Sequence, residues 1–259
     1  MPLNRPIADW NERRVWVVGA SQGIGAACAQ ALLARGARVA VSARGREALE
    51  RVVQPARTGK ALVLPLDITR PAEIATAFTA LRAQWGGADL VLIVAGTHAA
   101  MRAWELDGEI ARNLVETNLM GVLNVVEAVV PALLAQGRGG IAIVSSVAGY
   151  RGLPTGLVYG ATKAALINLT ETLYLDLAPR GLDVYLINPG FVKTPLTDRN
   201  PFKMPALISA EEAAGHTLRG LERGRFEIHY PRRFTNVMKL LRLLPYGLYF
   251  RVVRRTTGL

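Results

Sequence analysis

The chain has 259 residues, 51% of them hydrophobic, which suffices for one α/β domain with a substantial core that needs neither disulfides nor metals. The single Cys28 excludes an internal disulfide, and the absence of about 18 uninterrupted apolar residues predicts no membrane-spanning helix. Most of the net charge of +11 comes from the sequence after residue 218, which contains ten Lys and Arg but only two Glu. Met1–Trp10 lacks the apolar run of a signal peptide, so we expect a cytoplasmic protein.

Short apolar runs alternate with longer amphipathic ones along the chain. Most short runs are continuously apolar, as is typical of strands covered on both faces of a parallel sheet. We therefore predict a single-domain, Rossmann-like α/β fold over residues 1–231, with a doubly wound parallel sheet of about seven strands, helices on both faces and an extension at 232–259. The predicted strands are Arg14–Gly19, Ala37–Ala43, Ala61–Asp67, Asp89–Gly96, Gly140–Ser146, Asp183–Asn188 and Phe226–Tyr230. The predicted helices are Ile24–Arg35, Arg46–Val53, Pro71–Gln84, Gly108–Gln136, Val158–Ala178 and Ala210–Arg223.

A glycine-rich turn follows the first predicted strand and leads directly into a helix. Residues without Cβ permit a tight turn and let the backbone approach a pyrophosphate, while the helix N-terminus offers free N–H groups. This position predicts a dinucleotide phosphate loop. It consists of Gly19, Ser21, Gln22, Gly23, Ile24 and Gly25.

The second predicted strand ends in Val41-Ser42-Ala43-Arg44, with no carboxylate. Enzymes that use NAD place an acid near this position to bind the ribose 2′-hydroxyl. Arg44 can instead pair with a 2′-phosphate, which favours NADP(H) over NAD(H). A solvated surface arginine is the alternative.

Four polar residues predict proton-transfer chemistry at the carboxyl edge of the sheet. Tyr159 and Lys163 lie one helical turn apart, and a nearby ammonium favours the phenolate. Ser146 ends the fifth predicted strand thirteen residues earlier. Asn118 lies inside a long helical stretch, where an asparagine is unfavourable unless its side chain has a specific partner.

These residues resemble those of the short-chain dehydrogenase/reductase family, over roughly residues 12–231. The matches occur in family order and spacing. They are Gly19-x-x-x-Gly23-x-Gly25, Asp67, Ala95-Gly96, Asn118, Ser146, Tyr159-x-x-x-Lys163, and Asn188-Pro189-Gly190 with Thr194.

The resemblance implies a role for each matching residue. Tyr159 would be the general acid/base, and Lys163 would lower its pKa and hold the nicotinamide ribose. Ser146 would bind the substrate oxygen, and Asn118 would support a water relay behind Lys163. Further cofactor contacts would come from Asp67, Ile68, Ala95, Gly96, Pro189, Gly190, Val192 and Thr194. Members often form dimers or tetramers, so we expect a homodimer or homotetramer through the helices at 108–136 and 158–178.

The chain departs from the family pattern at three places. Val18 replaces a common Thr, and Ile93-Val94 replaces a common Asn-Asn. We interpret these two changes as a compensated loss of both hydrogen-bonding partners, which can be nearly neutral. Gln22 replaces a basic residue of NADP-preferring relatives, so recognition of a 2′-phosphate depends on Arg44.

Loops beyond the strand ends would form the substrate pocket, with segment 196–208 as a candidate lid. Their apolar character suggests a hydrophobic substrate, although ordinary packing explains each residue equally well. Candidate substrate contacts are His98, Tyr150, Phe191, Phe202 and Met204. The three histidines lack metal-ligand spacing, so we predict no metal site.

The C-terminal extension interleaves apolar and basic residues. Such a segment could lie on an anionic membrane surface, or pack on its own domain or on a subunit neighbour with its arginines pointing outward. No nucleic-acid recognition motif accompanies the charge, so nucleic acid is not expected.

Together these features predict an NADP(H)-dependent oxidoreductase that transfers a hydride between nicotinamide and a carbonyl or secondary alcohol. A catalytically idle nucleotide-binding scaffold at a membrane or in a complex is the alternative, although a scaffold has no need for Tyr159, Lys163, Ser146 and Asn118 together.

Overall fold

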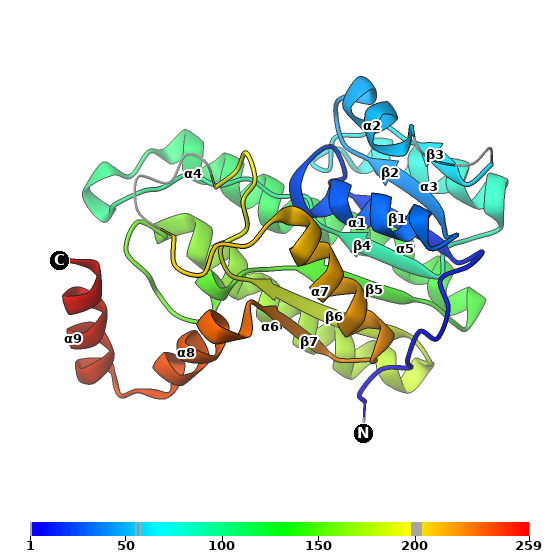
Figure 1. Ribbon diagram of the computed structural model, residues 1–259. Coiled ribbons are helices and arrows are strands. Elements are labelled where there is room, and N and C mark those ends of the chain that lie inside the picture. Colours follow the sequence, from blue (N-terminus) through cyan, green and yellow to red (C-terminus); the bar gives the residue numbers. More distant parts are fainter. Residues whose placement is uncertain (1, 55, 57–58, 198–203, 259) are drawn as a thin grey trace.

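The computed structural model describes residues 2–54, 56, 59–197 and 204–258, and its centre is one parallel sheet (Figure 1). The strand order is β3-β2-β1-β4-β5-β6-β7, and every neighbouring pair is parallel. This architecture confirms the predicted Rossmann-like fold class. The strands are β1 (Arg14–Val18), β2 (Arg38–Ser42), β3 (Ala61–Val63), β4 (Leu90–Ile93), β5 (Gly140–Val144), β6 (Asp183–Pro189) and β7 (Glu227–Tyr230).

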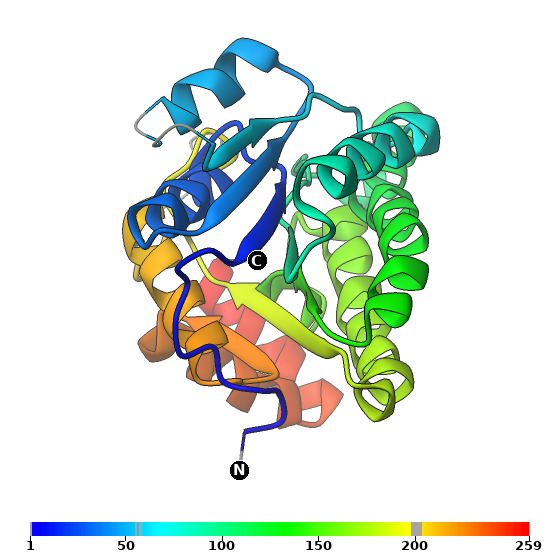
Figure 2. The same ribbon diagram turned by 90° about the vertical axis from the view of Figure 1, so that its right-hand side faces the viewer.

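Helices cover both faces of the sheet (Figure 2). Alternate strand residues point to opposite faces, so Val15 and Val17 enter one core and Trp16 and Val18 the other. The first core is completed by α1 (Gly23–Ala34), α2 (Arg46–Val53) and α7 (Ala210–Glu222). The second is completed by α3 (Pro71–Trp85), α5 (Gly121–Gln136) and α6 (Leu157–Leu177). The connections between strands and helices contain the short helical turns η1 (Ala103–Glu105), η3 (Val147–Gly149) and η4 (Ala178–Arg180).

The helix predicted at 108–136 consists of α4 (Gly108–Val115), a π-helical turn η2 (Glu116–Met120) and α5. Among the described residues, this run alone is long and apolar enough to cross a membrane, with a mean hydropathy of 1.7. However, Val122, Val125 and Val129 are buried against the sheet. The run is therefore the core helix that the alternating pattern predicts.

Two strands end at least three residues before their predicted carboxyl ends. The third ends at Val63 rather than Asp67, and the fourth at Ile93 rather than Gly96. Leu64 and Leu66 still donate backbone hydrogen bonds to the second strand's Val41 and to Ala43. The apolar run continues beyond the ladder because the chain turns there toward the pocket described below.

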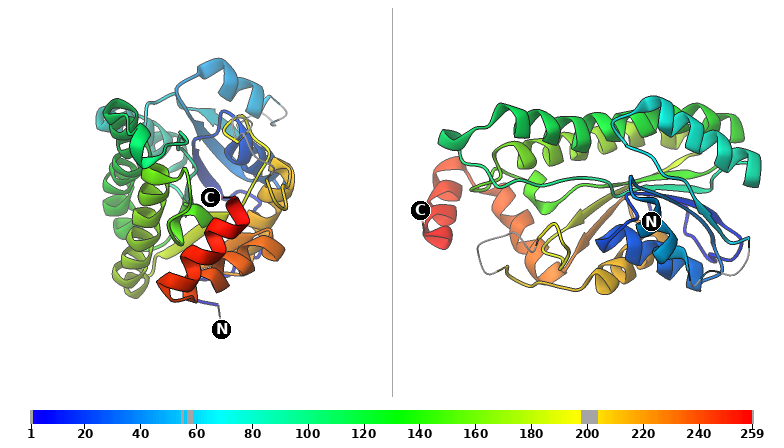
Figure 3. Two further views of the ribbon diagram at one scale, coloured as in Figure 1. Left: turned by 90° about the vertical axis from the view of Figure 1, so that its left-hand side faces the viewer. Right: turned by 90° about the horizontal axis from the view of Figure 1, so that it is seen from above.

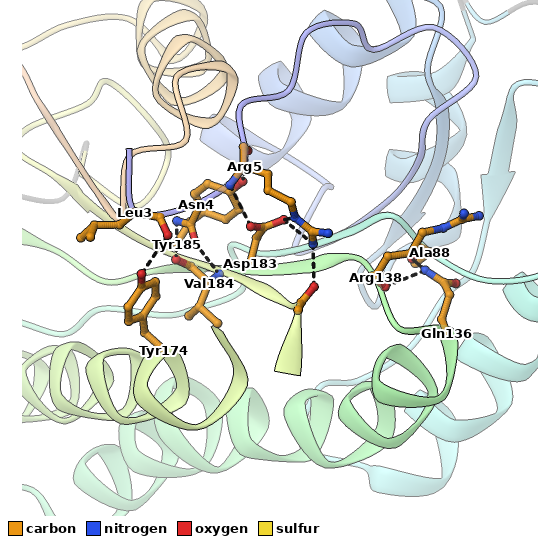
Figure 4. A network of polar contacts seen from close by, with 11 residues as sticks. Leu3, Asn4, Arg5, Ala88, Gln136, Arg138, Tyr174, Asp183, Val184 and Tyr185 are labelled. Carbon is orange, nitrogen blue, oxygen red and sulfur yellow. Dashed lines mark hydrogen bonds and ion pairs between the residues drawn. The ribbon is translucent and has the colours of Figure 1, made fainter. Parts of the chain in front are cut away.

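The N-terminal segment packs along the amino edge of the sheet (Figure 4). The Asn4 amide donates to Val184 O at 2.8 Å and accepts from Val184 N at 3.0 Å. Arg5 forms two side-chain hydrogen bonds to Asp183, at 3.0 and 2.8 Å, and a third to Gly181 O at 2.7 Å. The segment thus joins residues about 180 positions apart, and sequence patterning did not predict it.

The C-terminal extension forms two helices, α8 (Arg232–Leu243) and α9 (Tyr246–Thr257). They lie at the end of the molecule where α4 begins, well away from the N-terminus (Figures 1 and 3). Met238, Tyr249 and Val253 are buried against the domain. One face of the helix pair therefore packs on the chain's own domain, which is one of the arrangements that the sequence allows for this extension.

Candidate active site

A pocket of about 590 Å³ opens at the carboxyl ends of the strands. It lies where the strand order reverses between β1 and β4, the usual ligand position in such sheets. Most predicted cofactor and catalytic residues line it. They are Gly19, Ser21, Gln22, Gly23, Ile24, Arg44, Asp67, Ile68, Ala95, Gly96, Ser146, Tyr159, Lys163, Pro189, Gly190, Val192 and Thr194. Gly25 and Asn118 lie behind the wall.

The glycine-rich turn brings backbone close to backbone at one side of the pocket. Gly19 has φ +95°, and a Cβ there would lie 2.3 Å from Ala95 N; at Gly25 a Cβ would lie 2.1 Å from Gly19 O. Only glycine fits these positions. The first helix begins at Gly23 and has no acidic residue in its first turn, so its N-terminal N–H groups and partial positive charge suit a pyrophosphate.

The strand ends beside this turn keep their geometry without the family's polar residues. Val18 pairs in register with Ile93, and both are buried. Backbone hydrogen bonds from Val94 N and Ala95 N to Val18 O, at 2.8 and 3.0 Å, close the two strands together. Backbone hydrogen bonds and apolar packing therefore join these two strand ends.

Arg44 and Asp67 line the pocket beyond the ends of the second and third strands. Arg44 is exposed and lines the pocket just beyond the second strand. Asp67 accepts hydrogen bonds from Thr69 N at 2.9 Å and Thr69 Oγ1 at 2.8 Å, which lower its pKa together with the charge of Arg44. An anionic group beside Arg44 would meet a cation that has no carboxylate within 4.0 Å among the described residues.

Tyr159, Ser146 and Lys163 meet at the opposite end of the pocket. Tyr159 lies in the first turn of α6, and its phenol lies close enough to the Ser146 hydroxyl for that hydroxyl to lower the pKa of the phenol. Ser146 Oγ also accepts from Ala148 N at 3.1 Å, which fixes the side chain at the end of β5. Lys163 is 4% exposed, and its Nζ donates to Val144 O at 3.1 Å. Its Nζ lies 5.7 Å from the centroid of the Tyr159 ring.

Burial dominates the titration of both groups. It raises the pKa of the Tyr159 phenol, and the Ser146 hydrogen bond only partly offsets this effect. Burial lowers the pKa of Lys163 to about 8. The net shift of the Tyr159 pKa is therefore upward, because burial is its largest cause and Lys163 Nζ donates to the carbonyl oxygen of Val144.

Asn118 is fully buried in the π-helical turn η2. Its Oδ1 accepts from Thr97 N at 2.7 Å, and its Nδ2 donates to Thr97 O at 2.9 Å and to Thr162 Oγ1 at 3.3 Å. A π-helical turn shifts the helix register locally and is frequent at functional sites. Here it directs the amide toward the segment after β4 that forms the pocket wall.

The predicted substrate contacts separate into different environments. His98 packs edge-on against Tyr159, with ring centroids 4.6 Å apart, and burial lowers its pKa, so it is neutral at pH 7. Phe191 packs against Phe234 of α8 at 5.4 Å. Met204 is partly buried, and Phe202 lies outside the described residues.

The prediction for Tyr150 needs correction. Its side chain is buried, and its hydroxyl donates to Glu227 Oε1 at 2.6 Å. Tyr150 packs with Val147, Ile167 and Met238 under α8. Its position after Ser146 suggested a pocket wall, but its partner on β7 lies 77 residues away in sequence.

Several pocket residues were not predicted. Thr97, Asn113 and Thr117 line the pocket from the β4–α4 connection and the following helix. Asn113 and Thr117 are four residues apart on one helix face, the only sequence signal that could have found them. Residues 198–203 of the candidate lid at 196–208 lie outside the described residues. Next to them, Lys193 N donates to Ile208 O at 2.8 Å, and Thr197 Oγ1 donates to Val192 O at 2.6 Å.

Comparisons with known proteins agree with this geometry. An uncharacterised oxidoreductase of Myxococcus xanthus is 35% identical over 251 residues, covering 96% of this chain and 99% of the relative. A short-chain dehydrogenase of Burkholderia cenocepacia in complex with NADP has a TM-score of 0.82 at 30% identity, covering 95% of this chain and 99% of that one. An actinorhodin polyketide ketoreductase variant with NADPH has a TM-score of 0.78 at 26% identity, covering 89% and 100%.

The family profile described as short chain dehydrogenase matches residues 13–203, which contain the phosphate loop, Ser146, Tyr159 and Lys163. The match covers well over half of the chain. This chain therefore belongs to the short-chain dehydrogenase family of oxidoreductases.

Proposed function

We propose that the protein is an NADP(H)-dependent oxidoreductase that interconverts a carbonyl and a secondary alcohol on a hydrophobic substrate. One observation carries the proposal: one end of a single pocket is lined by the glycine-rich turn and by Arg44, which has no carboxylate within 4.0 Å in the described part of the chain, and the other end holds Tyr159, Ser146 and Lys163. A dinucleotide and a small substrate are what such a pocket can hold together.

The chain's residues fit a nicotinamide dinucleotide. The backbone positions at Gly19 and Gly25 leave no room for a Cβ, and the N-terminus of α1 is free of acids. Gly23 and Ile24 would hold the pyrophosphate, and Arg44 the 2′-phosphate. Val192 and Thr194 would contact the nicotinamide, which supplies or accepts the hydride when bound.

Tyr159 moves the proton in this scheme. During reduction its phenol donates a proton to the substrate oxygen, while Ser146 Oγ donates a hydrogen bond to the same oxygen. The raised pKa of Tyr159 suits this direction, because it keeps the phenol protonated before transfer. Lys163, with its cation 5.7 Å from the ring centroid, stabilises the phenolate that remains.

Asn118 and His98 support these groups from either side. Asn118 fixes the backbone of Thr97 beside Lys163, whose Nζ lies within 3.5 Å of a Cβ placed on Gly96. His98 covers one edge of the Tyr159 ring as a neutral imidazole. The apolar residues Pro195 and Leu196 support a hydrophobic substrate, since they line the same pocket.

Fluorescence titration with NADPH and NADH tests the cofactor assignment. We expect NADPH to bind more tightly, and Arg44→Ala to weaken NADPH binding about tenfold while NADH binding hardly changes, because a charge-assisted bidentate contact to a phosphate is lost. Arg46→Ala is the matched control, since Arg46 is also exposed but is paired with Glu50 at 3.7 Å.

Equal weakening in both variants would remove Arg44 from this role. Failure of the parent protein to bind either nucleotide would contradict the proposed function and favour the scaffold alternative. Retention of NADPH binding without reduction of any carbonyl compound in a hydrophobic panel would contradict the substrate class alone.

A further inference from the structure

The two C-terminal helices carry apolar side chains that the domain does not cover. One face of the pair is buried through Met238, Tyr249 and Val253. The rest exposes six large apolar side chains to between 45% and 78%. They are Val237, Leu240, Leu243, Tyr246, Leu248 and Phe250. Val237 and Leu240 are three residues apart on α8, while Tyr246 and Phe250 are four apart on α9 and stack at 5.8 Å, so each pair lies on one helix face.

The same helices are strongly basic. Residues 231–259 contain seven Lys and Arg and no Asp or Glu. Lys239 is paired with Glu227. The remaining six have no carboxylate within 4.0 Å among the described residues, and all six are exposed: Arg232, Arg233, Arg242, Arg251, Arg254 and Arg255.

The helix pair is held in place before any partner binds. Arg151 Nη1 donates to the carbonyl oxygens of Leu241, Arg242 and Leu244, at 3.1, 3.1 and 2.6 Å. Its guanidinium lies 4.1 Å from the Tyr249 ring centroid and 4.7 Å from that of Tyr246. The surface is therefore preformed, and docking does not require it to fold.

This surface lies at the end of the molecule where the pocket opens. Figures 1 and 3 place α9 and the segment carrying η1 and the start of α4 at the same end. That segment adds Trp104 at 78% exposure and Leu106 at 59%, but also Glu105, Asp107 and Glu109. The acidic residues of that segment make α8 and α9 the more strongly basic part of this end of the molecule.

We propose that α8 and α9 dock the protein peripherally on an anionic lipid bilayer, with their apolar side chains in the headgroup region and their arginines against lipid phosphates and carboxylates. Shallow insertion of an amphipathic helix combined with basic residues is the recognised mode of interfacial binding. Charge complementarity favours this occupant over a second copy of the chain, because two identical surfaces without acids repel each other. The inference does not depend on the proposed function.

Flotation of the full-length protein with vesicles tests the proposal. Vesicles of phosphatidylcholine with about 30% phosphatidylserine should recover most of the protein, whereas pure phosphatidylcholine, or about 0.5 M NaCl, should reduce recovery several-fold. Arg254→Glu/Arg255→Glu should weaken binding about tenfold or more, since each basic residue contributes separately. Leu240→Ser/Leu243→Ser should weaken it on both vesicle types.

The matched control is Arg82→Glu/Arg180→Glu, which makes the same charge change at exposed residues of α3 and η4. It should retain flotation within about twofold. Every substituted side chain is exposed, so circular dichroism melting should show unchanged folding.

Three results would overturn the proposal. One is absence of flotation with anionic vesicles, and another is an equal loss in the control variant. The third is light scattering that shows a dimer converted to a monomer by Leu240→Ser/Leu243→Ser with flotation unaffected, which would make the surface an interface between two copies.

Discussion

At the amino edge of the sheet, Arg5 and Arg14 are ion-paired with Asp183 and Asp89, at 2.8 and 2.6 Å. At the carboxyl edge, the cations of Lys163 and Arg44 have no carboxylate within 4.0 Å among the residues described. Paired charges at one edge stabilise the fold, while unpaired charges at the other are available to a ligand. Mutations at the two ends of the strands should therefore have separable effects, on stability at the amino edge and on the proposed chemistry at the carboxyl edge.

The largest expected effect is on catalysis at the carboxyl edge. Tyr159→Phe should reduce kcat by roughly 10²–10⁴-fold, because it removes the proposed proton donor. NADPH affinity and melting temperature should stay close to those of the parent, since the ring and its packing on His98 remain. Steady-state kinetics with the best-reduced carbonyl substrate of a panel, alongside a melting curve, measures both. Full turnover in this variant would refute the mechanism.

Lys163→Met should stabilise the fold while it impairs catalysis. Burial lowers the pKa of Lys163 from 10.5 to about 8, a shift that corresponds to about 3 kcal/mol of differential stability. The pKa of Lys163 is lower in the folded chain than in the unfolded chain, so between these two values the folded chain binds fewer protons. The free energy of unfolding of the parent therefore rises with pH through that window. The gain in free energy of unfolding of the variant over the parent should therefore be largest at neutral pH. Loss of the hydrogen bond to Val144 O reduces this gain.

Urea unfolding of the parent and variant at several pH values between 7 and 10.5 tests this prediction. The difference in free energy of unfolding should shrink across the window. Lys193→Met, at an exposed position of the pocket loop, serves as the matched control. A difference that is constant with pH would show that Lys163 is not strained by burial.

A smaller effect, on stability alone, is expected at the amino edge. Asp89 accepts hydrogen bonds from Arg14 N, Nε and Nη2, so Asp89→Asn should cost about 2 kcal/mol and leave kinetic constants unchanged. Burial raises the pKa of Asp89, but the bonds from Arg14 outweigh it, so the net pKa is lowered. This stability is present above the unfolded pKa, about 4, and is lost as the pH falls through the folded value.

The exposed partner of the other amino-edge pair gives the control. The Arg5 side chain is 56% exposed, so Arg5→Ala should cost at most about 1 kcal/mol. Chemical denaturation with cofactor titration separates the two properties. A loss of NADPH affinity in Asp89→Asn without a loss of stability would break the comparison.

Local sequence patterns predicted the strands and the phosphate loop because their signals are contiguous. Short apolar runs, most of them continuous, identify the strands, and the glycines require close backbone approach within a few residues. The ends of β3 and β4 were placed too late because the apolar run continues past the ladder into the pocket wall.

Contacts between distant residues could not be predicted. Asn118 bonds to Thr97, and Tyr150 to Glu227, through geometry that only the folded chain creates. The same holds for Asn4, whose partner is 180 residues away. No sequence pattern predicts the π-helical turn, although Asn118 at its centre is unusual inside a helix and was singled out for that reason.

The hydrogen bonds of Arg151 to the C-terminal helices have an evolutionary consequence. It bonds to main-chain carbonyls of residues 241, 242 and 244, and every amino acid supplies such an oxygen. Side chains on the outer face of α8 can therefore be exchanged without loosening the attachment. Arg151 itself lies between Ser146 and Tyr159 in the sequence, so the attachment point is close to the proposed catalytic residues. Selection can retune the outer surface of the extension while the reaction centre stays fixed.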